Sequence, residues 1–535
     1  MKHIRCNPKT FGVVDLFAGP GGLGEGFASL RDNGTYPFRI GISVEKEGSA
    51  HKTLTLRAFL REMVRKTGQL PQKYVEFHAG LISEPDWNEV DAAAWAHAQH
   101  EARCLELGTD AAAEIIDREV DSLRAGYADT ILIGGPPCQA YSLVGRARSK
   151  GTRGYRPQED QRHFLFREYI RVLDRLRPAA FVLENVKGVL SSKIGPRRIF
   201  DEILQDLASL GGAGPQLYQL RALSIEGNRL RLAEVRKASD YIVRAEKLGV
   251  PQRRHRVIII GIRSDLAARA DVASLDLPSV TKVSVEDAIG NLPPLRSGLS
   301  RTVDNEDDWT TAVLNAAKRL RRLHADAGEP AMSAAFAKAA SRIRRNRLSR
   351  EDRGLPPSYG KANDPLRQWL ENGQLLALAQ HQTRGHMPAD LERYLFASVF
   401  GSVNRRCAQK RDYPQALAPD HRSWARGVFS DRFRPQLAHE PSTTIVSHIS
   451  KDGHYFIHPD PTQCRSLTVR EAARLQTFPD DYLFLGNRTQ QYVQVGNAVP
   501  PYLARQIAQL LLRVLDSSAA CRTLPSGKEL ELLSA

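Results

Sequence analysis

Short apolar runs alternate with helix-length amphipathic stretches along this 535-residue chain. Segments such as ILI, AFVL and VIIIGI are apolar at nearly every position. This pattern is typical of strands that are buried on both faces, as in a parallel sheet covered by helices. We therefore expect a doubly wound α/β domain with strands at residues 12–17, 39–44, 130–133, 179–183 and 257–262.

Two later stretches break this alternation. Residues 84–128, between the second and third strands, carry Ala, Leu and charged side chains at helical spacing, which predicts an inserted helical pair. From about residue 280 the chain becomes polar and Arg-rich, with helical stretches at 317–324 and 334–350. We assign a first domain to residues 1–279 and a second domain to residues 280–440.

The C-terminal part is apolar and compact again. We expect residues 441–515 to complete the first domain and to end in an apolar helix at 501–515. The polar tail, 516–535, is expected to be disordered. We see no internal repeat.

The charge balance favours a polyanionic partner. The net charge is +16, and residues 301–440 hold 24 Lys+Arg against 16 Asp+Glu, about half of that excess. Nucleic acid is the first candidate. An acidic membrane surface is a weaker one, because the basic residues are not grouped beside an apolar anchor.

The cysteines predict neither a disulfide framework nor a metal site. All six are far apart, and none forms a CxxC pair or a zinc-ligand spacing with histidine. The N-terminus has no apolar signal region, and no run approaches the roughly 20 apolar residues of a membrane span. We expect a cytoplasmic monomer without metal.

The first strand runs into DLFAGPGGLGEGF, where closely spaced glycines allow the backbone to turn tightly beside a ligand. Such a turn alone is a weak signal, and it is not the GxGxxG of dinucleotide-binding proteins. The second strand ends at Glu45, which is either a solvated glutamate or an acceptor for ribose hydroxyls.

The third strand ends in GGPPCQAYS, which puts Cys138 just past the carboxyl edge of the sheet. Most cysteines are inert core residues. Two glycines and two prolines fix the backbone here, however, which suits the presentation of a thiolate in one orientation. Residues 139–162 hold six Lys+Arg and predict a mobile basic loop able to close on phosphates.

The fourth strand brings Glu184 and Asn185 to the same edge. The segment QRRHR then places three arginines before a buried strand. Alternate residues of a strand point the same way, so Arg254 and Arg256 are expected to share a face and to hold an anion or a carboxylate. The alternatives are a helix cap for Glu184 and a solvated face for the arginines.

Six motifs together resemble the DNA (cytosine-5)-methyltransferase family of bacterial restriction-modification systems. They are DLFAGPGG, GGPPCQ, ENV, QRRHR, RSLTVREAARLQTFPDDY and QVGNAVPP, in that order along the chain. The resemblance implies a Rossmann-like class I methyltransferase domain with a mixed, mostly parallel sheet. It also implies that residues 280–440 are a smaller target-recognition domain.

The resemblance also implies roles for individual residues. Cys138 would be the nucleophile on a flipped-out cytosine of duplex DNA, and Glu184, held by Asn185 and Arg254, would contact the base beside Arg256. The cofactor would be S-adenosylmethionine. Its expected contacts are Phe17, Pro20, Gly22, Glu45, Ile82, Pro137, Leu165, Asn497 and Ala498.

The chain departs from the family pattern in two places. Leu81 stands before Ile82 where the family has an aspartate that contacts the cofactor's adenine, which puts that one contact in doubt. Ala140 and Tyr141 stand where the family usually has Gly and Phe.

Two rival functions remain open at this point. One is a tRNA cytosine-5 methyltransferase, although the chain lacks the Cys-Phe-Thr tripeptide of that branch. The other is an inactive, cofactor-binding DNA-recognition protein. A companion restriction endonuclease is the expected functional partner.

Overall fold

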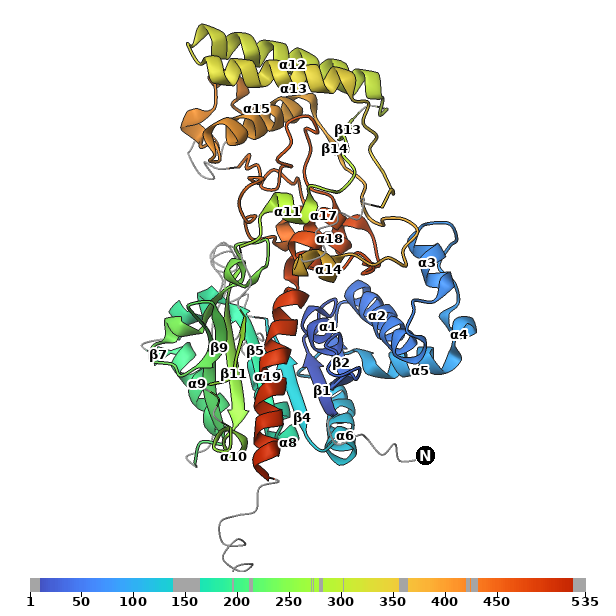
Figure 1. Cartoon of the computed structure of the whole chain (residues 1–535), viewed down its shortest axis with the longest axis vertical. Helices are drawn as coiled ribbons and strands as arrows, with labels where there is room; N and C mark the ends of the chain where they lie inside the picture. The colour runs from blue at the N-terminus through green and yellow to red at the C-terminus, as the bar shows by residue number, and fades with distance from the viewer. Residues whose placement is uncertain are drawn as a thin grey trace, which may run out of the picture.

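A computed structural model describes the chain apart from residues 1–9, 138–163, 195–196, 211–214, 271, 273, 279–281, 302, 356–363, 420–423, 425–431 and 523–535. It has a sheet-containing part and, above it in Figure 1, a helical part. The strands are β1 (Phe11–Leu16), β2 (Phe38–Glu45), β3 (Ala102–Cys104), β4 (Thr130–Gly134), β5 (Ala180–Val186), β6 (Lys193–Ile194), β7 (Arg197–Arg198), β8 (Tyr218–Glu226), β9 (Arg229–Ala233), β10 (Ile242–Arg244), β11 (His255–Arg263), β12 (Asp276–Pro278), β13 (Gly298–Leu299) and β14 (Gly385–His386).

The main sheet is mixed and mostly parallel at its centre. Its strand order is β12-β9-β8-β11-β5-β4-β1-β2-β3, and β10 pairs with β11. Strands β3, β2, β1, β4 and β5 run parallel, whereas β11 is antiparallel to both β5 and β8. The five predicted strands are confirmed as β1, β2, β4, β5 and β11, and so is the expected Rossmann-like fold class.

Helices cover both faces of this sheet, as the continuous apolar strands predict. Alternate residues divide between two clusters: Val13 packs toward α1 and α19, and Val14 packs toward α6, α8 and α9. The helices of this part are α1 (Gly22–Ala28), α2 (Gly48–Thr67), α3 (Gln72–His78), α4 (Trp87–Val90), α5 (Ala92–Glu101), α6 (Asp110–Gly126), α8 (Phe164–Leu176), α9 (Ile199–Ser209), α10 (Ser264–Ala267) and α19 (Pro501–Arg522).

Helix α19 returns from the C-terminal region to the sheet, where it runs beside α1 (Figure 1). A Cβ at Gly26 would lie 2.3 Å from the Cβ of Ala504, so the two helices touch closely. The expectation that the tail starts at Asp516 is wrong in its boundary. The helix continues to Arg522, and the buried Ser518 hydroxyl donates to the carbonyl of Leu266 at 3.1 Å.

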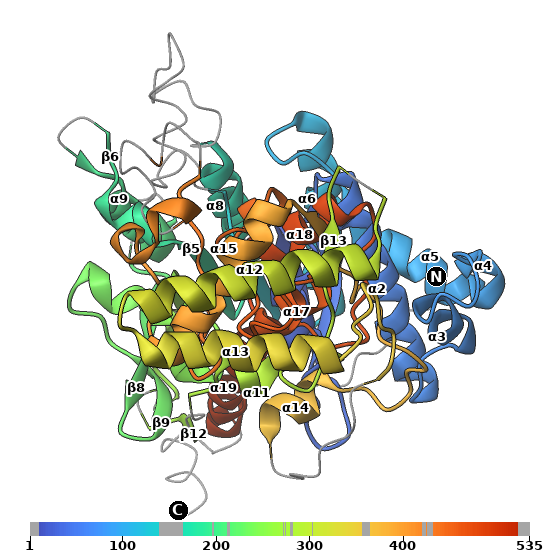
Figure 2. The same ribbon diagram turned by 90° about the horizontal axis from the view of Figure 1, so that it is seen from above.

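The upper part is a helical unit. Helices α12 (Glu306–Asp326) and α13 (Pro330–Arg345) lie side by side over α15 (Pro388–Asn404), as the view from above shows (Figure 2). Their shared core also takes in Ile457 and Cys464. The helices between the two parts are α11 (Val285–Ile289), α14 (Pro365–Leu370), α17 (Val469–Leu475) and α18 (Arg488–Asn497).

The boundaries expected at residues 280 and 440 do not coincide with a change of core. Val285 and Ile289, on the way into the helical unit, pack against Ala472 and Phe478 of the C-terminal segment. The chain thus crosses between the two parts several times, and the C-terminal segment fills the junction.

Candidate active site

The turn after β1 is held in an unusual backbone conformation. Phe17, Gly19 and Gly21 have φ values of 59°, 57° and 97°, in the left-handed region. Helix α1 then begins at Gly22, where a Cβ would lie 2.2 Å from the carbonyl oxygen of Val499. Glycine at position 22 therefore allows the C-terminal segment to close directly over the turn.

Glu45, at the end of β2, is oriented by this turn. Its carboxylate accepts hydrogen bonds from the backbone N–H of Gly19 at 2.9 Å and from that of Glu47 at 2.8 Å. The side chain is only half-buried, and a carboxylate has about four acceptor positions, so it retains capacity for ligand hydroxyls. Glu45 and the turn thus lie together, as the sequence predicts.

The position next to Glu45 at this edge belongs to β3, and the contact expected from Ile82 stays a prediction. Ile82 follows α3, a helix that packs toward the C-terminal segment through the bond between His78 Nε2 and the carbonyl of Asp480 at 3.0 Å. The strand next to Glu45 is instead β3, inside the predicted helical insertion, and the N–H of Leu105 donates to the Glu45 carbonyl at 3.1 Å. Strand β3 has only three residues, and two of them are Arg103 and Cys104. It therefore gives no apolar signal in the sequence and was not predicted.

The other half of the edge is formed by β4 and β5. The predicted nucleophile Cys138 lies outside the described residues, which end here at Pro137. Asn185 Nδ2 donates to the carbonyl of Pro136 at 3.3 Å, and a Cβ at Gly135 would lie 3.0 Å from Glu184 Oε2. Glu184 and Asn185 therefore lie against the backbone segment that leads into Cys138.

Glu184 forms an ion pair with Arg256, with Arg256 Nε 3.0 Å from Glu184 Oε1. Both side chains are largely buried, with 14% and 16% exposure. The pair follows from strand register, because Glu184 faces Ile258 and Arg256 lies two residues earlier on the same side of β11.

Arg254 has a different role from the one expected. It is buried, and its guanidinium donates to the carbonyls of Ile445 at 3.0 Å and Gly496 at 3.3 Å, so it ties the C-terminal segment to the edge while Arg256 holds Glu184. Burial lowers the pKa of both arginines, and for Arg254 the nearby charge of Arg256 lowers it further. Two buried cations therefore face one carboxylate.

Three further predicted contacts lie on the side of the edge that holds the glycine-rich turn and β3. Asn497 and Ala498 end α18, just before the Val499 carbonyl that meets Gly22, and Gln476 donates to the carbonyl of Ala498. Leu165, in the first turn of α8, is half-buried, and a Cβ at Gly108, beyond β3, would lie 3.8 Å from its Cδ2.

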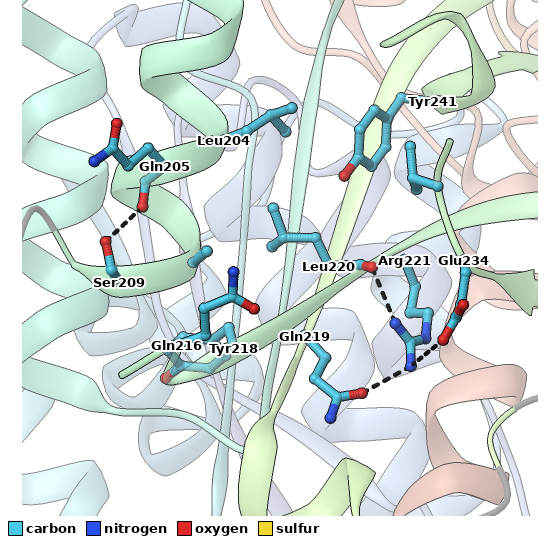
Figure 3. Close-up of a pocket in the computed structure, with 12 residues that line it drawn as sticks. Leu204, Gln205, Ser209, Gln216, Tyr218, Gln219, Leu220, Arg221, Glu234 and Tyr241 are labelled. Carbon is cyan, nitrogen blue, oxygen red and sulfur yellow. Dashed lines mark hydrogen bonds and ion pairs between the residues drawn. The ribbon is translucent and has the colours of Figure 1, made fainter. Parts of the chain in front are cut away.

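A separate cavity of about 640 Å³ lies between α9 and β8 (Figure 3). Gln219 and Arg221 line it, and they pair with Ile262 and Ile260 near the end of β11. Arg256 is at the start of that strand, so the cavity is not part of the carboxyl edge.

None of the described helices is long and apolar enough to cross a membrane. Within the same residues, no three His, Cys, Asp or Glu side chains are grouped to bind a metal ion.

Comparison with known proteins agrees with this geometry. The family described as C-5 cytosine-specific DNA methylase matches residues 112–513. Type II methyltransferase M.Bpa9945I of Bacillus paralicheniformis is 31% identical, with 94% of this chain and 99% of the relative covered.

Two further relatives show the same similarity over much of their length. Type II methyltransferase M.AgeI of Thalassovita gelatinovora is 26% identical over 93% of this chain and 98% of its own. DNA (cytosine-5-)-methyltransferase M.ApeKI of Aeropyrum pernix is 28% identical over 77% of this chain and 86% of its own. The chain belongs to the C-5 cytosine-specific DNA methylase family.

Proposed function

We propose that this protein transfers a methyl group from S-adenosylmethionine to carbon 5 of a cytosine in a specific duplex DNA sequence. The observation that carries the proposal is the shared carboxyl edge. The glycine-rich turn and Glu45 lie at the ends of β1 and β2, and the Glu184–Arg256 pair lies where the end of β5 meets the start of the antiparallel β11. Open α/β sheets bind their ligands at this edge, where the strand order reverses.

The cofactor-side residues fit S-adenosylmethionine. Phe17, Pro20 and Gly22 form the turn, Glu45 offers acceptors for the ribose hydroxyls, and Leu165, Asn497 and Ala498 lie around the same half of the edge. Pro137 precedes Cys138 on the other side. When bound, the cofactor supplies an electrophilic methyl group. Ile82, which follows α3, stays a predicted contact, and we propose Leu105, at the end of β3, as a further one.

The residues of the catalytic half supply covalent activation. Carbon 5 of cytosine is a poor nucleophile, so the thiolate of Cys138 adds to carbon 6 while the carboxyl group of Glu184, held by Arg256, donates a hydrogen bond to ring nitrogen 3. Carbon 5 takes the methyl group, and loss of its proton then expels the thiolate. Asn185 holds the Pro136 carbonyl and so steadies the backbone before the nucleophile.

This chemistry requires a base outside the duplex stack. The basic segment 139–162, which the sequence predicts to close on phosphates, lies outside the described residues. Residues 280–440 carry about half of the excess of Arg and Lys and would contact the major groove and phosphates. The relatives that bear type II names support a place in a restriction-modification system, beside a separate endonuclease.

The test is methyl transfer from tritium-labelled S-adenosylmethionine to mixed-sequence duplex DNA or tRNA, with base identification after nuclease digestion. We expect label in DNA as 5-methylcytosine, and loss of at least about 10³-fold in the rate for Cys138→Ser, because the hydroxyl is a far weaker nucleophile. Calorimetric binding of S-adenosylhomocysteine should not change in that variant.

Label in tRNA alone would assign the protein to the RNA rival. Binding of S-adenosylhomocysteine and DNA without any transfer would support the inactive homologue. Wild-type rates in Cys138→Ser would overturn the covalent mechanism.

A further inference from the structure

Tyr482, in the C-terminal segment after α17, touches the backbone of the glycine-rich turn. The side chain is fully buried, and its hydroxyl donates a hydrogen bond to the carbonyl of Pro20. A Cβ at Gly21 would lie 3.0 Å from that hydroxyl oxygen. A residue more than 450 positions along the chain from the turn therefore fixes one of its carbonyl groups.

The ring of Tyr482 is itself held by a buried ion cluster, which we call the support cluster: Glu25, Arg57, Arg61, Glu101 and Asp481. The guanidinium of Arg57 lies 4.9 Å from the centre of the Tyr482 ring. Arg57 also pairs with Glu25 at 2.6 Å and with Asp481 at 3.1 Å. Glu25 is in α1, directly after the turn, so the ring and the helix are joined through one side chain of α2.

Two further elements fix the segment that carries Tyr482. The hydroxyl of Tyr74, in α3, donates to the carbonyl of Asp481 at 2.5 Å. Asn372, on the return from the helical unit, donates to Asp481 Oδ2 at 2.7 Å. The tyrosine hydroxyl is therefore presented to Pro20 by a rigid framework with contributions from three regions of the chain.

The turn needs an external restraint of this kind. Phe17 is a non-glycine residue in the left-handed region, a backbone conformation that is strained unless the surrounding structure compensates. A turn that samples other conformations binds its ligand more weakly by the fraction of time spent in them.

We propose that Tyr482 is a positioning residue for the cofactor: its hydroxyl keeps the glycine-rich turn in the binding conformation before the cofactor arrives. This rests on the proposed function, which places S-adenosylmethionine at that turn. Because Tyr482 is fully buried and bonds to the backbone of the turn, it acts on binding rather than on the transfer step. Helices α2 and α3 support it through Arg57 and Tyr74.

The experiment is Tyr482→Phe, which removes a single oxygen atom. The matched control is Tyr218→Phe, because Tyr218 is equally buried and its hydroxyl also donates to a backbone carbonyl, that of Pro178 at 3.1 Å, away from the turn. Calorimetry with S-adenosylhomocysteine should give a Kd about three- to tenfold higher for Tyr482→Phe and unchanged for the control. At saturating cofactor, kcat should stay within about twofold.

A second measurement does not depend on ligand binding. Hydrogen exchange of the cofactor-free protein should be faster in the peptide that covers residues 17–25 of Tyr482→Phe, and unchanged in one that covers residues 179–186. An unchanged Kd and exchange rate, an equal loss in both variants, or a fall in kcat with constant Kd would each overturn the proposal. Failure of the wild-type protein to bind S-adenosylhomocysteine would instead refute the proposed function.

Discussion

The two halves of the carboxyl edge are supported by buried charges of opposite balance. Behind the glycine-rich turn, the support cluster sets three carboxylates against two guanidinium groups. At the catalytic half, Arg254 and Arg256 face the single carboxylate of Glu184. One half has an excess of negative charge, and the other an excess of positive charge.

The pKa values respond to this difference. The carboxylates overcome the cost of burial around Arg57 and Arg61 and raise the pKa of both, and Arg57 in turn lowers the pKa of Glu25. At Arg254 and Arg256 the cost of burial outweighs the attraction of Glu184, so their pKa is lowered. The two guanidinium groups of the support cluster thus have carboxylate partners within the protein, whereas the catalytic half holds buried positive charge that an electron-rich ligand would compensate.

The largest expected effect comes from breaking the support cluster. Arg57→Met leaves Glu25 and Asp481 buried without their main partner, so the free energy of unfolding should fall by about 3–5 kcal/mol. Urea denaturation checks this. The control is Arg175→Met in the exposed pair of Arg175 and Asp121, which should leave the urea midpoint unchanged. A midpoint equal to that of the wild type for Arg57→Met would mean that the cluster is not a support.

Removing a guanidinium from the catalytic half should lower the rate of methyl transfer and change the stability little. Arg256→Met takes away one of two crowded cations, so the free energy of unfolding should stay within about 1 kcal/mol of the wild type. The rate of methyl transfer should fall about 10²- to 10³-fold, because Glu184 loses the group that orients it. Single-turnover transfer of tritium to DNA measures the rate. A variant that is both unstable and active would remove the distinction between the two halves.

The sequence predicts these halves unequally, for a physical reason. Apolar strands such as β4 and β5, and the residues at their ends, follow from local composition, and so does the place of Glu184 and Asn185. Because alternate residues of a strand point the same way, the sequence predicts that Arg254 and Arg256 share a face. Arg254 precedes β11, however, and its guanidinium donates to the carbonyls of Ile445 and Gly496. Such a contact between distant segments leaves no local pattern.

The support cluster is beyond local inference for the same reason. Arg57 is 32 positions from Glu25 and 424 from Asp481, and each of them alone reads as an ordinary surface charge on a helix or turn. The motif that contains Asp481 and Tyr482 was identified by resemblance, without any indication that it meets Pro20. Strand β3 and the antiparallel strands β8 and β9 were missed because they are short or only half apolar.

The smallest expected effect concerns Asp15, a further carboxyl group behind the glycine-rich turn. It is fully buried beside the support cluster, and burial raises its pKa to about 8, against the opposing charge of Arg61. Within the described residues it forms no ion pair, and a Cβ at Gly24 would lie 2.8 Å from its Oδ2. A proton on Asp15 therefore limits the excess of negative charge behind the turn.

This gives a pH dependence whose sign can be tested. Above about pH 4 the unfolded chain has released the Asp15 proton, whereas the folded protein keeps it until about pH 8. The contribution of Asp15 to stability is therefore fully present below pH 4 and is lost as the pH rises toward 8. Asp15→Asn cannot titrate, so its free energy of unfolding relative to the wild type should rise by at least about 2 kcal/mol between pH 5 and pH 8. Urea denaturation of both proteins across this range cancels all other titrations. A constant difference would mean that Asp15 is already ionised in the folded protein and that the negative excess behind the turn is larger by one charge.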